Sequence, residues 1–275
     1  MAVCAEAQDA ARGPAQRRIR NPARPPHKST ECWIDKTITL NVDMGKNDPN
    51  IDEVNARVES GGLRGPVDWV FPAWEVYIEY EARRIAEAFP LTEEERRALL
   101  GFGEVMKGLL QRAHEYTRTK LTSIYDAINN NNYKLEGGRL YAPDGAWMHV
   151  GEEPHVVIED IEDIVYFPDV MKLPHEKLEL FQLGWEVHEE EGEGGRPVYA
   201  TADPALFLAW AAARFGELHV SIARALLLED GVAVEVKAVA RSWKKRWSRR
   251  EAERLVEKYA KRGVWEPFFT MWLGE

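Results

Sequence analysis

The clearest alternation of hydrophobic and polar positions lies in the last quarter of the chain. Leu218 to Leu228 is an apolar run, residues 229–231 form a turn signal, and Val232 to Ala240 is a second apolar run. Within the second run the apolar side chains recur at every other position, so Glu235 and Lys237 share the opposite face. The pattern predicts two paired antiparallel strands joined by a tight turn.

Helical periodicity appears on both sides of these two strands. Ala205 to Phe215 is apolar on nearly all sides, which predicts a buried helix. Ser248 and Glu251 have the spacing of a capping box that opens a second helix, and Gly263 stands where that helix would end. Glu266 to Leu273 is expected as a final strand. The C-terminal part therefore predicts a small α/β domain with the order helix, two strands, helix, strand.

The first half of the chain reads as one strand followed by helices. Cys32 to Met44 alternates cleanly, which predicts a half-buried strand. Ala73 to Phe89 has helical period and stops before a proline. Thr92 opens a further helix with a capping box, and helical pattern continues to about Asn129 with an expected interruption at residues 116–117.

A short hairpin is expected directly after these helices, from Tyr133 to Tyr141, around a Glu-Gly-Gly turn. A basic, Thr-rich helix from Thr117 to Ile128 followed by a hairpin has the order of a winged-helix module, in which the helix enters the major groove of DNA. Many other α+β domains also place a hairpin after a helix, so both interpretations stay open. The side chains expected to face the DNA groove are Arg118, Thr119, Lys120 and Ser123.

The middle of the chain is acidic. Residues 151–196 hold fourteen acidic side chains against three basic ones. The expected elements are short strands at Val156 to Ile158 and Ile164 to Phe167, a helix from Pro174 to Leu183, and a hairpin from Trp185 to Tyr199. His188 lies beside the carboxylates of the hairpin tip, but no second His stands at metal-ligand spacing, so the tip is interpreted as a solvated loop.

These elements together predict an α+β fold with a helical, winged-helix-like first part and a small α/β last part. A typical domain has roughly 100 to 200 residues, which favours two main domains here. The N-terminal segment has almost no large apolar side chains, so burial cannot offset its ordering entropy. The predicted divisions are a flexible basic arm (1–30), a winged-helix-like domain (31–150), an acidic connecting region (151–200) and an α/β domain (201–275).

Charge is segregated along the chain. The net charge of −10 argues against indiscriminate coating of nucleic acid. Residues 12–28, however, hold five Arg and one Lys with no acid, and residues 237–262 hold eleven bases against three acids. Both segments predict phosphate contacts. For the N-terminal segment the alternative is a solubilising tail.

The basic segment, residues 241–250, combines cations with aromatic rings. Lys and Arg neutralise phosphates, and Trp offers a flat face for unpaired bases. The alternative is an amphipathic segment that docks on the acidic middle of the same chain or of a partner. The residues predicted to contact nucleic acid are Arg241, Trp243, Lys244, Lys245, Arg246, Trp247, Arg249 and Arg250.

Composition restricts the setting and the chemistry. Cys4 and Cys32 are the only cysteines, which argues against a disulfide framework and favours a reducing, cytoplasmic compartment. The sequence contains no run of about 18 apolar residues, so no membrane span is predicted. No phosphate-binding loop or serine-hydrolase motif is present. Abundant Arg, Glu and Trp with scarce Gln favour a thermophilic source.

The order of the C-terminal elements, with Glu-Val-Lys at residues 235–237, resembles the PD-(D/E)XK nuclease superfamily, and within it the archaeal Holliday-junction resolvases. The resemblance covers roughly the last quarter of the chain. It implies that Glu235 holds a divalent metal such as Mg²⁺ and that Lys237 positions or activates the attacking water. Where the family has a second metal-binding Asp, this chain has Ser221. The substitutes available in another strand register are Glu217, His219 and Asp230.

The leading functional prediction is an intracellular protein that binds DNA or RNA, encoded on a mobile or viral element of a thermophile; no motif supports that origin. One alternative is a Mg²⁺-dependent nuclease of the resembled superfamily. Another is an assembly protein, in which basic segments pair with the acidic region of a neighbouring copy to form a homo-oligomer. Glu235 and Lys237 also fit an exposed cross-strand ion-pair pattern, which needs no metal.

Overall fold

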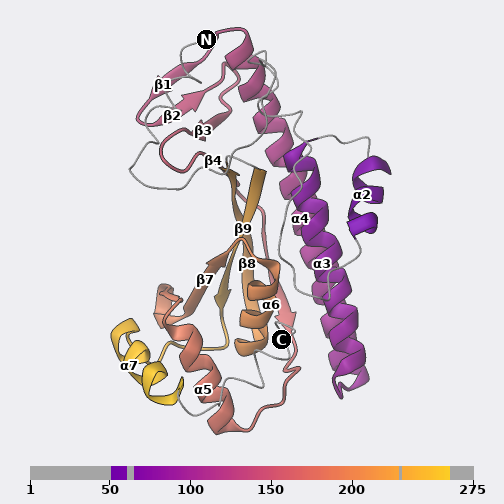
Figure 1. The fold of residues 1–275 in the computed structure, drawn as a ribbon, viewed down its shortest axis with the longest axis vertical. Coiled ribbons are helices and arrows are strands. Elements are labelled where there is room, and N and C mark those ends of the chain that lie inside the picture. Colours follow the sequence, from indigo (N-terminus) through magenta and orange to yellow (C-terminus); the bar gives the residue numbers. More distant parts are fainter. Residues whose placement is uncertain (1–50, 61–64, 229–230, 261–275) are drawn as a thin grey trace, which may run out of the picture.

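The computed structural model describes residues 51–60, 65–228 and 231–260. Within these ranges the predicted α+β class is confirmed: helices pack against one antiparallel sheet (Figure 1). The helices are α2 (Ile51–Ser60), α3 (Pro66–Ala88), α4 (Glu93–Asn129), α5 (His175–Glu186), α6 (Pro204–Ala213) and α7 (Arg249–Ala260). The strands are β1 (Lys134–Glu136), β2 (Arg139–Tyr141), β3 (Trp147–His149), β4 (His155–Val157), β5 (Glu162–Phe167), β6 (Glu190–Glu191), β7 (Pro197–Thr201), β8 (Gly216–Leu228) and β9 (Gly231–Ala240).

All nine strands of the described ranges belong to one sheet, in the order β1-β2-β3-β4-β8-β9-β7-β6, with β5 also paired to β8. The 13-residue β8 pairs with β5 through its first half and with β4 through its second half. It therefore joins the strands that follow α4 to the C-terminal strands. Because the sheet crosses residues 150 and 200, the predicted divisions at these positions do not separate different sheets.

The two strands predicted from alternation are confirmed as β8 and β9. Their register pairs Ile222 with Val236, and then shifts at a β-bulge so that Arg224 lies opposite Glu235. A bulge turns one side chain out of the regular alternation. This bulge is the reason that a basic residue of β8 faces the carboxylate of β9.

The long helix α4 begins at the predicted capping box. The Thr92 hydroxyl accepts from the Glu95 N–H, and the Glu95 carboxylate accepts from the Thr92 N–H. This backbone hydrogen bond, with a further one from Lys172, lowers the pKa of Glu95 to about 2. The predicted interruption at residues 116–117 is wrong, since α4 continues to Asn129. Thr117 is fully buried, and such packing outweighs the modest helix propensity of Tyr and Thr.

The hairpin predicted after α4 is confirmed as β1 and β2, which turn through Gly137 and Gly138 at positive φ. It is one end of the large sheet, because β2 pairs with β3 and β3 with β4. The helix predicted to read DNA, residues 117–128, is the second half of the 37-residue α4. The order of elements is the predicted one, but the hairpin is not a separate wing.

The second predicted hairpin begins later than expected. The helix predicted to end at Leu183 continues to Glu186 as α5, so Trp185 is helical. Its ring packs edge-on against Tyr199, with 5.2 Å between the ring centres. The hairpin itself consists of β6 and β7, joined by a 3-10 turn at Glu193–Gly195.

Helices α3, α4 and α6 cover one face of the sheet. Phe102 of α4 lies 5.0 Å from the ring of Phe167 of β5 and 6.2 Å from that of Phe207 of α6. The Trp210 ring of α6 stacks on Tyr199 of β7 at 5.8 Å. The other face of the sheet is called the open face, and its side chains in β2, β3, β4, β5, β8 and β9 are half-buried or exposed. Figure 1 shows α4 extending past α3 toward β1–β3, with α5 and α7 at the opposite end of the molecule.

Several predicted features lie outside the described residues. They are the basic arm (1–30), the strand Cys32–Met44, the residues Asp230 and Gly263, and the final strand Glu266–Leu273.

Candidate functional site

Glu235 and Lys237, the centre of the predicted nuclease site, lie on the open face of β9. Arg224 of β8 holds the Glu235 carboxylate: its Nε donates to Oε1 and its Nη2 to Oε2, each at 2.9 Å. These hydrogen bonds raise the pKa of the Arg224 guanidinium. Both carboxylate oxygens are engaged in a bidentate pair, so a metal ion at Glu235 would have to share the carboxylate with Arg224 or displace it.

The structure does not bring Glu217 or His219, two of the predicted metal ligands, to Glu235. His219 pairs with Val239, which lies about 13 Å from Glu235 along β9. The Glu217 carbonyl accepts from the N–H of Arg241, about 20 Å from Glu235. The side chains of His219 and Glu217 have ion-pair partners of their own. Among the residues that the structure describes, no cluster of three His, Cys, Asp or Glu side chains is arranged to hold a metal.

Ser221 lies directly opposite Lys237, where the resembled family would have its second carboxylate. The Ser221 hydroxyl donates to the Lys237 carbonyl at 3.5 Å. The Lys237 side chain is exposed. The two strands thus have the expected register, but Ser221 supplies no charge to a metal site, and Lys237 presents its ammonium group to solvent.

The basic segment predicted to contact nucleic acid folds back onto the end of α5. The indole N–H of Trp243 donates to the Phe215 carbonyl at 2.8 Å. The Lys245 ammonium donates to the carbonyl of Glu186 at 3.2 Å and to that of Glu189 at 2.7 Å. Both predicted contact residues are therefore engaged within the chain.

The backbone of the same segment is held by one α5 carboxylate. Glu186 accepts from the N–H of Arg246 at 3.1 Å and from the N–H of Trp247 at 3.4 Å. The Arg246 guanidinium pairs with Glu179, also on α5. For these residues the structure shows the intramolecular alternative, in which the basic segment docks on the acidic middle of its own chain.

A buried ionic network lies beneath the docked segment. Arg214, 1% exposed, donates from Nε to Glu189 Oε1 and from Nη2 to Glu189 Oε2, both at 2.8 Å. Its Nη2 also lies 3.3 Å from Glu186 Oε1, and the Trp210 indole donates to Glu189 at 2.7 Å. Glu186 therefore links buried Arg214 to the backbone of the basic segment.

The remaining predicted contacts of the basic segment lie at the surface. Arg249 pairs with Glu253 at 3.1 Å, and Arg241 lies 4.0 Å from Glu217. The side chains of Lys244 and Arg250 are exposed. These four cations can reach a partner without disturbing the docked part.

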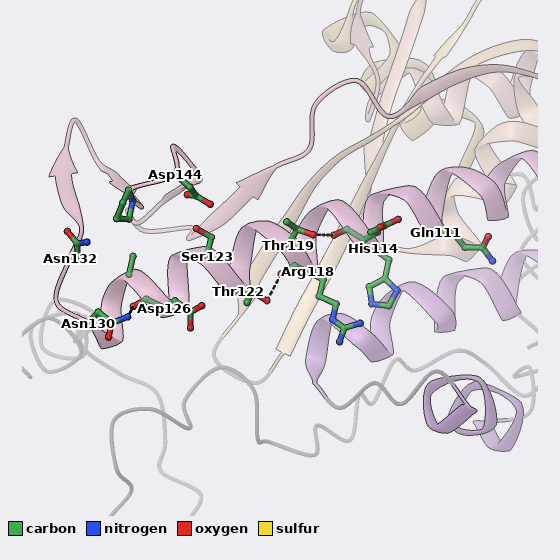
Figure 2. A pocket seen from close by; sticks show the side chains of 13 residues that line it. Gln111, His114, Arg118, Thr119, Thr122, Ser123, Asp126, Asn130, Asn132 and Asp144 are labelled. Carbon is green, nitrogen blue, oxygen red and sulfur yellow. Dashed lines mark hydrogen bonds between the residues drawn. The ribbon is translucent and has the colours of Figure 1, made fainter.

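The residues predicted to face DNA from α4 have two different surroundings. Arg118, Thr119 and Ser123 line a groove of about 870 Å³, drawn in Figure 2. Lys120 does not belong to this lining, and its ammonium lies 5.4 Å from the centre of the Tyr116 ring. A helix that reads a major groove protrudes from the protein, whereas this side of α4 is hollowed.

An aromatic and cationic surface, which sequence reasoning missed, lies on the open face of β2, β3 and β4. The Arg139 guanidinium lies 4.3 Å from the centre of the Trp147 ring. The rings of His149 and His155 lie 4.4 Å apart at 30°, and Trp147 meets His149 edge-on at 5.1 Å. The Tyr141 ring lies 6.4 Å from that of Trp147. The stacking surface is defined as the half-buried side chains of Arg139, Tyr141, Trp147, His149 and His155.

The strand register assembles the stacking surface. Tyr141 pairs with Trp147, Arg139 with His149, and His149 with His155. Directly opposed residues share a face of the sheet, as do residues two apart on one strand. In the sequence, aromatic or basic residues occupy every other position of residues 139–141 and 147–149. This pattern indicates a shared surface only once the pairing of the strands is known.

The surroundings of His149 in the stacking surface disfavour a positive charge on its imidazole. Burial lowers the pKa of His149, and electrostatic repulsion from the neighbouring His155 and Arg139 lowers it further. The neutral imidazole is therefore favoured near pH 7. A bound anion would reverse the repulsion and raise the pKa of His149.

No protein-family model matches the chain, and neither the curated proteins nor the solved structures give a match. Within the described ranges, none of the helices combines the length and the apolar character needed to cross a lipid bilayer.

Proposed function

We propose that the protein binds single-stranded nucleic acid across the open face of its sheet. The observation that carries this proposal is the stacking surface, in which three adjacent strands present rings and a guanidinium group on one half-exposed face. Single-stranded RNA and DNA are commonly bound by bases stacking on aromatic or Arg side chains of an exposed sheet.

Cations of the same face supply phosphate contacts. Arg139 lies within the stacking surface, and the exposed Lys237 lies on β9. The sheet order β3-β4-β8-β9 places that strand about 14 Å from β3 at the usual spacing between strands. A strand of nucleic acid that crosses the sheet can therefore stack at one end and pair its phosphates at the other.

Unpaired bases are favoured over a duplex for two reasons. A duplex keeps its bases stacked inside and offers a protein mainly phosphates and groove edges. A chain with net charge −10 repels a polyanion at long range, so electrostatics alone bind duplex weakly. Stacking adds the short-range attraction that single strands can use.

The test is the affinity of the full chain for labelled single-stranded and duplex oligonucleotides, measured by fluorescence anisotropy. Stacking is worth about 1–3 kcal/mol per base, so Trp147→Ala should weaken single-strand binding about 5- to 150-fold. Arg139→Ala should weaken it less and reduce the salt slope by about 0.7, the contribution of one phosphate contact.

The matched control is Tyr166→Ala. Tyr166 is 55% exposed on β5, also on the open face, and pairs with Glu217 of β8. Glu217 lies about 23 to 30 Å along β8 from the three residues that pair with β4, Arg224 to Leu226. Equal losses in both variants, or unchanged affinity in a folded Trp147→Ala protein, would contradict the proposal.

A further inference from the structure

The groove along α4 differs in chemistry from the stacking surface. With about 100° and 1.5 Å per residue in a helix, Glu115, Thr122 and Asp126 project within about 40° of one another. All three line the groove and are exposed. The two carboxylates mark the ends of a polar row that is about 16 Å long.

On one flank of this row, His114 and Arg118 face a carboxylate of α3. His114 Nε2 lies 2.8 Å from Asp68 Oδ1 of α3, and Arg118 Nε lies 3.9 Å from the same oxygen. Figure 2 shows His114 and Arg118 on one side of α4, with Ser123 and Asp144 on the other.

The uncharged polar groups of the groove present acceptors. The Thr119 and Thr122 hydroxyls donate to the carbonyl groups four residues earlier in α4, at 2.9 and 2.8 Å. The side-chain amide of Asn130 does the same at 2.9 Å. A hydroxyl has one proton, so the lone pairs of both Thr side chains remain for a ligand.

The carboxylates at the two ends of the row are uncompensated. Neither Glu115 nor Asp126 has a side-chain hydrogen bond or ion pair in the part of the chain that the structure describes. A lone carboxylate accepts hydrogen bonds only, and it favours a cation. The groove therefore suits an elongated ligand that carries positive charge at both ends and donors between them.

We propose that this groove binds a linear polyamine, with terminal ammonium groups at Glu115 and Asp126 and inner amines at Thr119 and Thr122. An extended tetraamine such as spermine measures roughly 16 Å between its end nitrogens, given bond lengths of about 1.5 Å. This matches the row. Spermidine, roughly 11 Å long by the same reasoning, reaches only one carboxylate at a time. The proposal is independent of nucleic-acid binding.

The experiment is isothermal titration of the full chain, free of nucleic acid, with spermine, spermidine, putrescine and a tetralysine peptide. Spermine should bind most tightly. A partly exposed ion pair is worth up to about 1 kcal/mol, so Glu115→Gln and Asp126→Asn should each weaken spermine binding about fivefold. The double variant should lose the preference for spermine over spermidine.

The control variant is Glu104→Gln, which removes the same charge from an exposed position of α4 outside the groove lining. It should change spermine affinity by no more than about twofold, because a carboxylate outside the groove contributes only a screened, general attraction to the cation. Equal effects of Glu104→Gln and Glu115→Gln would overturn the proposal. So would the absence of spermine binding, or tighter binding of tetralysine, which would indicate a peptide site. Nucleic-acid affinity, measured in parallel, should not change in Glu115→Gln.

Discussion

Replacing Arg214 by Met should destabilise the fold strongly, because the change leaves two buried carboxylates without a cation. The side chains of Arg214, Glu186 and Glu189 are 1%, 0% and 0% exposed. Removing one partner of a buried ion pair costs about 3–5 kcal/mol of unfolding free energy, because the remaining charge stays desolvated. Glu186 also holds the backbone of the basic segment, so the loss should extend to the docking of residues 243–247.

The magnitude can be checked by urea unfolding followed by circular dichroism and by calorimetry. For a chain of this size 1 kcal/mol corresponds to about 2–4 °C, so the melting temperature should fall by at least about 6 °C. The matched control is Arg224→Met, which breaks the pair with Glu235, whose two side chains are 33% and 18% exposed. It should cost less than about 1 kcal/mol.

A triple variant, Arg214→Met with Glu186→Gln and Glu189→Gln, removes the charges together and keeps one acceptor oxygen at each of the two glutamate positions. It should recover most of the lost stability, because no uncompensated charge remains buried. If Arg214→Met costs no more than Arg224→Met, or if the triple variant is the least stable of the three, the network does not work as an ion cluster and the reasoning fails.

Three further outcomes are expected. Glu235→Gln should change the free energy of unfolding by less than about 1 kcal/mol and should strengthen binding of single-stranded nucleic acid, because it releases Arg224; weaker binding in anisotropy would contradict this. The lowered pKa of His149 predicts tighter binding as pH falls from about 8 to about 6, since bound phosphate raises that pKa and couples binding to proton uptake. His149→Gln should flatten this profile, and an unchanged profile would remove His149 from the site. The double variant Lys244→Gln with Arg250→Gln should reduce single-strand affinity less than Arg139→Ala does. A larger loss in the double variant would indicate that the basic segment is the main binding site.

Local patterns were enough to predict the main elements of the fold. β8 and β9 follow from period-two alternation over long segments, and the capping box at Thr92 follows from residue spacing. The same reasoning failed where packing decides. An interruption of the helical pattern predicts a break at residues 116–117, but burial of Thr117 keeps α4 continuous. The extent of the sheet was missed because β3 has only three residues, too few to show alternation, and because the pairing of the expected strand at Val156 to Ile158 depends on distant segments.

The candidate sites were harder to predict, because each depends on pairing between distant segments. Glu235 and Lys237 share a face, as expected, but a bulge of β8 gives Glu235 an Arg partner. The stacking surface needs the register of three strands. The basic segment was identified by composition, which cannot tell whether a cation faces solvent or, like Lys245, the carbonyl groups of α5.

Internal pairing changes what the charge of this chain implies for binding. Lys245 and Arg246 are engaged with α5, so they are not available for direct contacts with the phosphates of a polyanion. Each phosphate contact on a single strand contributes about 0.7 to the salt slope, and few contacts remain available on the open face. Affinity should therefore depend on stacking more than on counterion release. If the affinity of Trp147→Ala still depends steeply on salt concentration, the surface cations dominate binding. The nucleic acid would then lie away from the open face of the sheet.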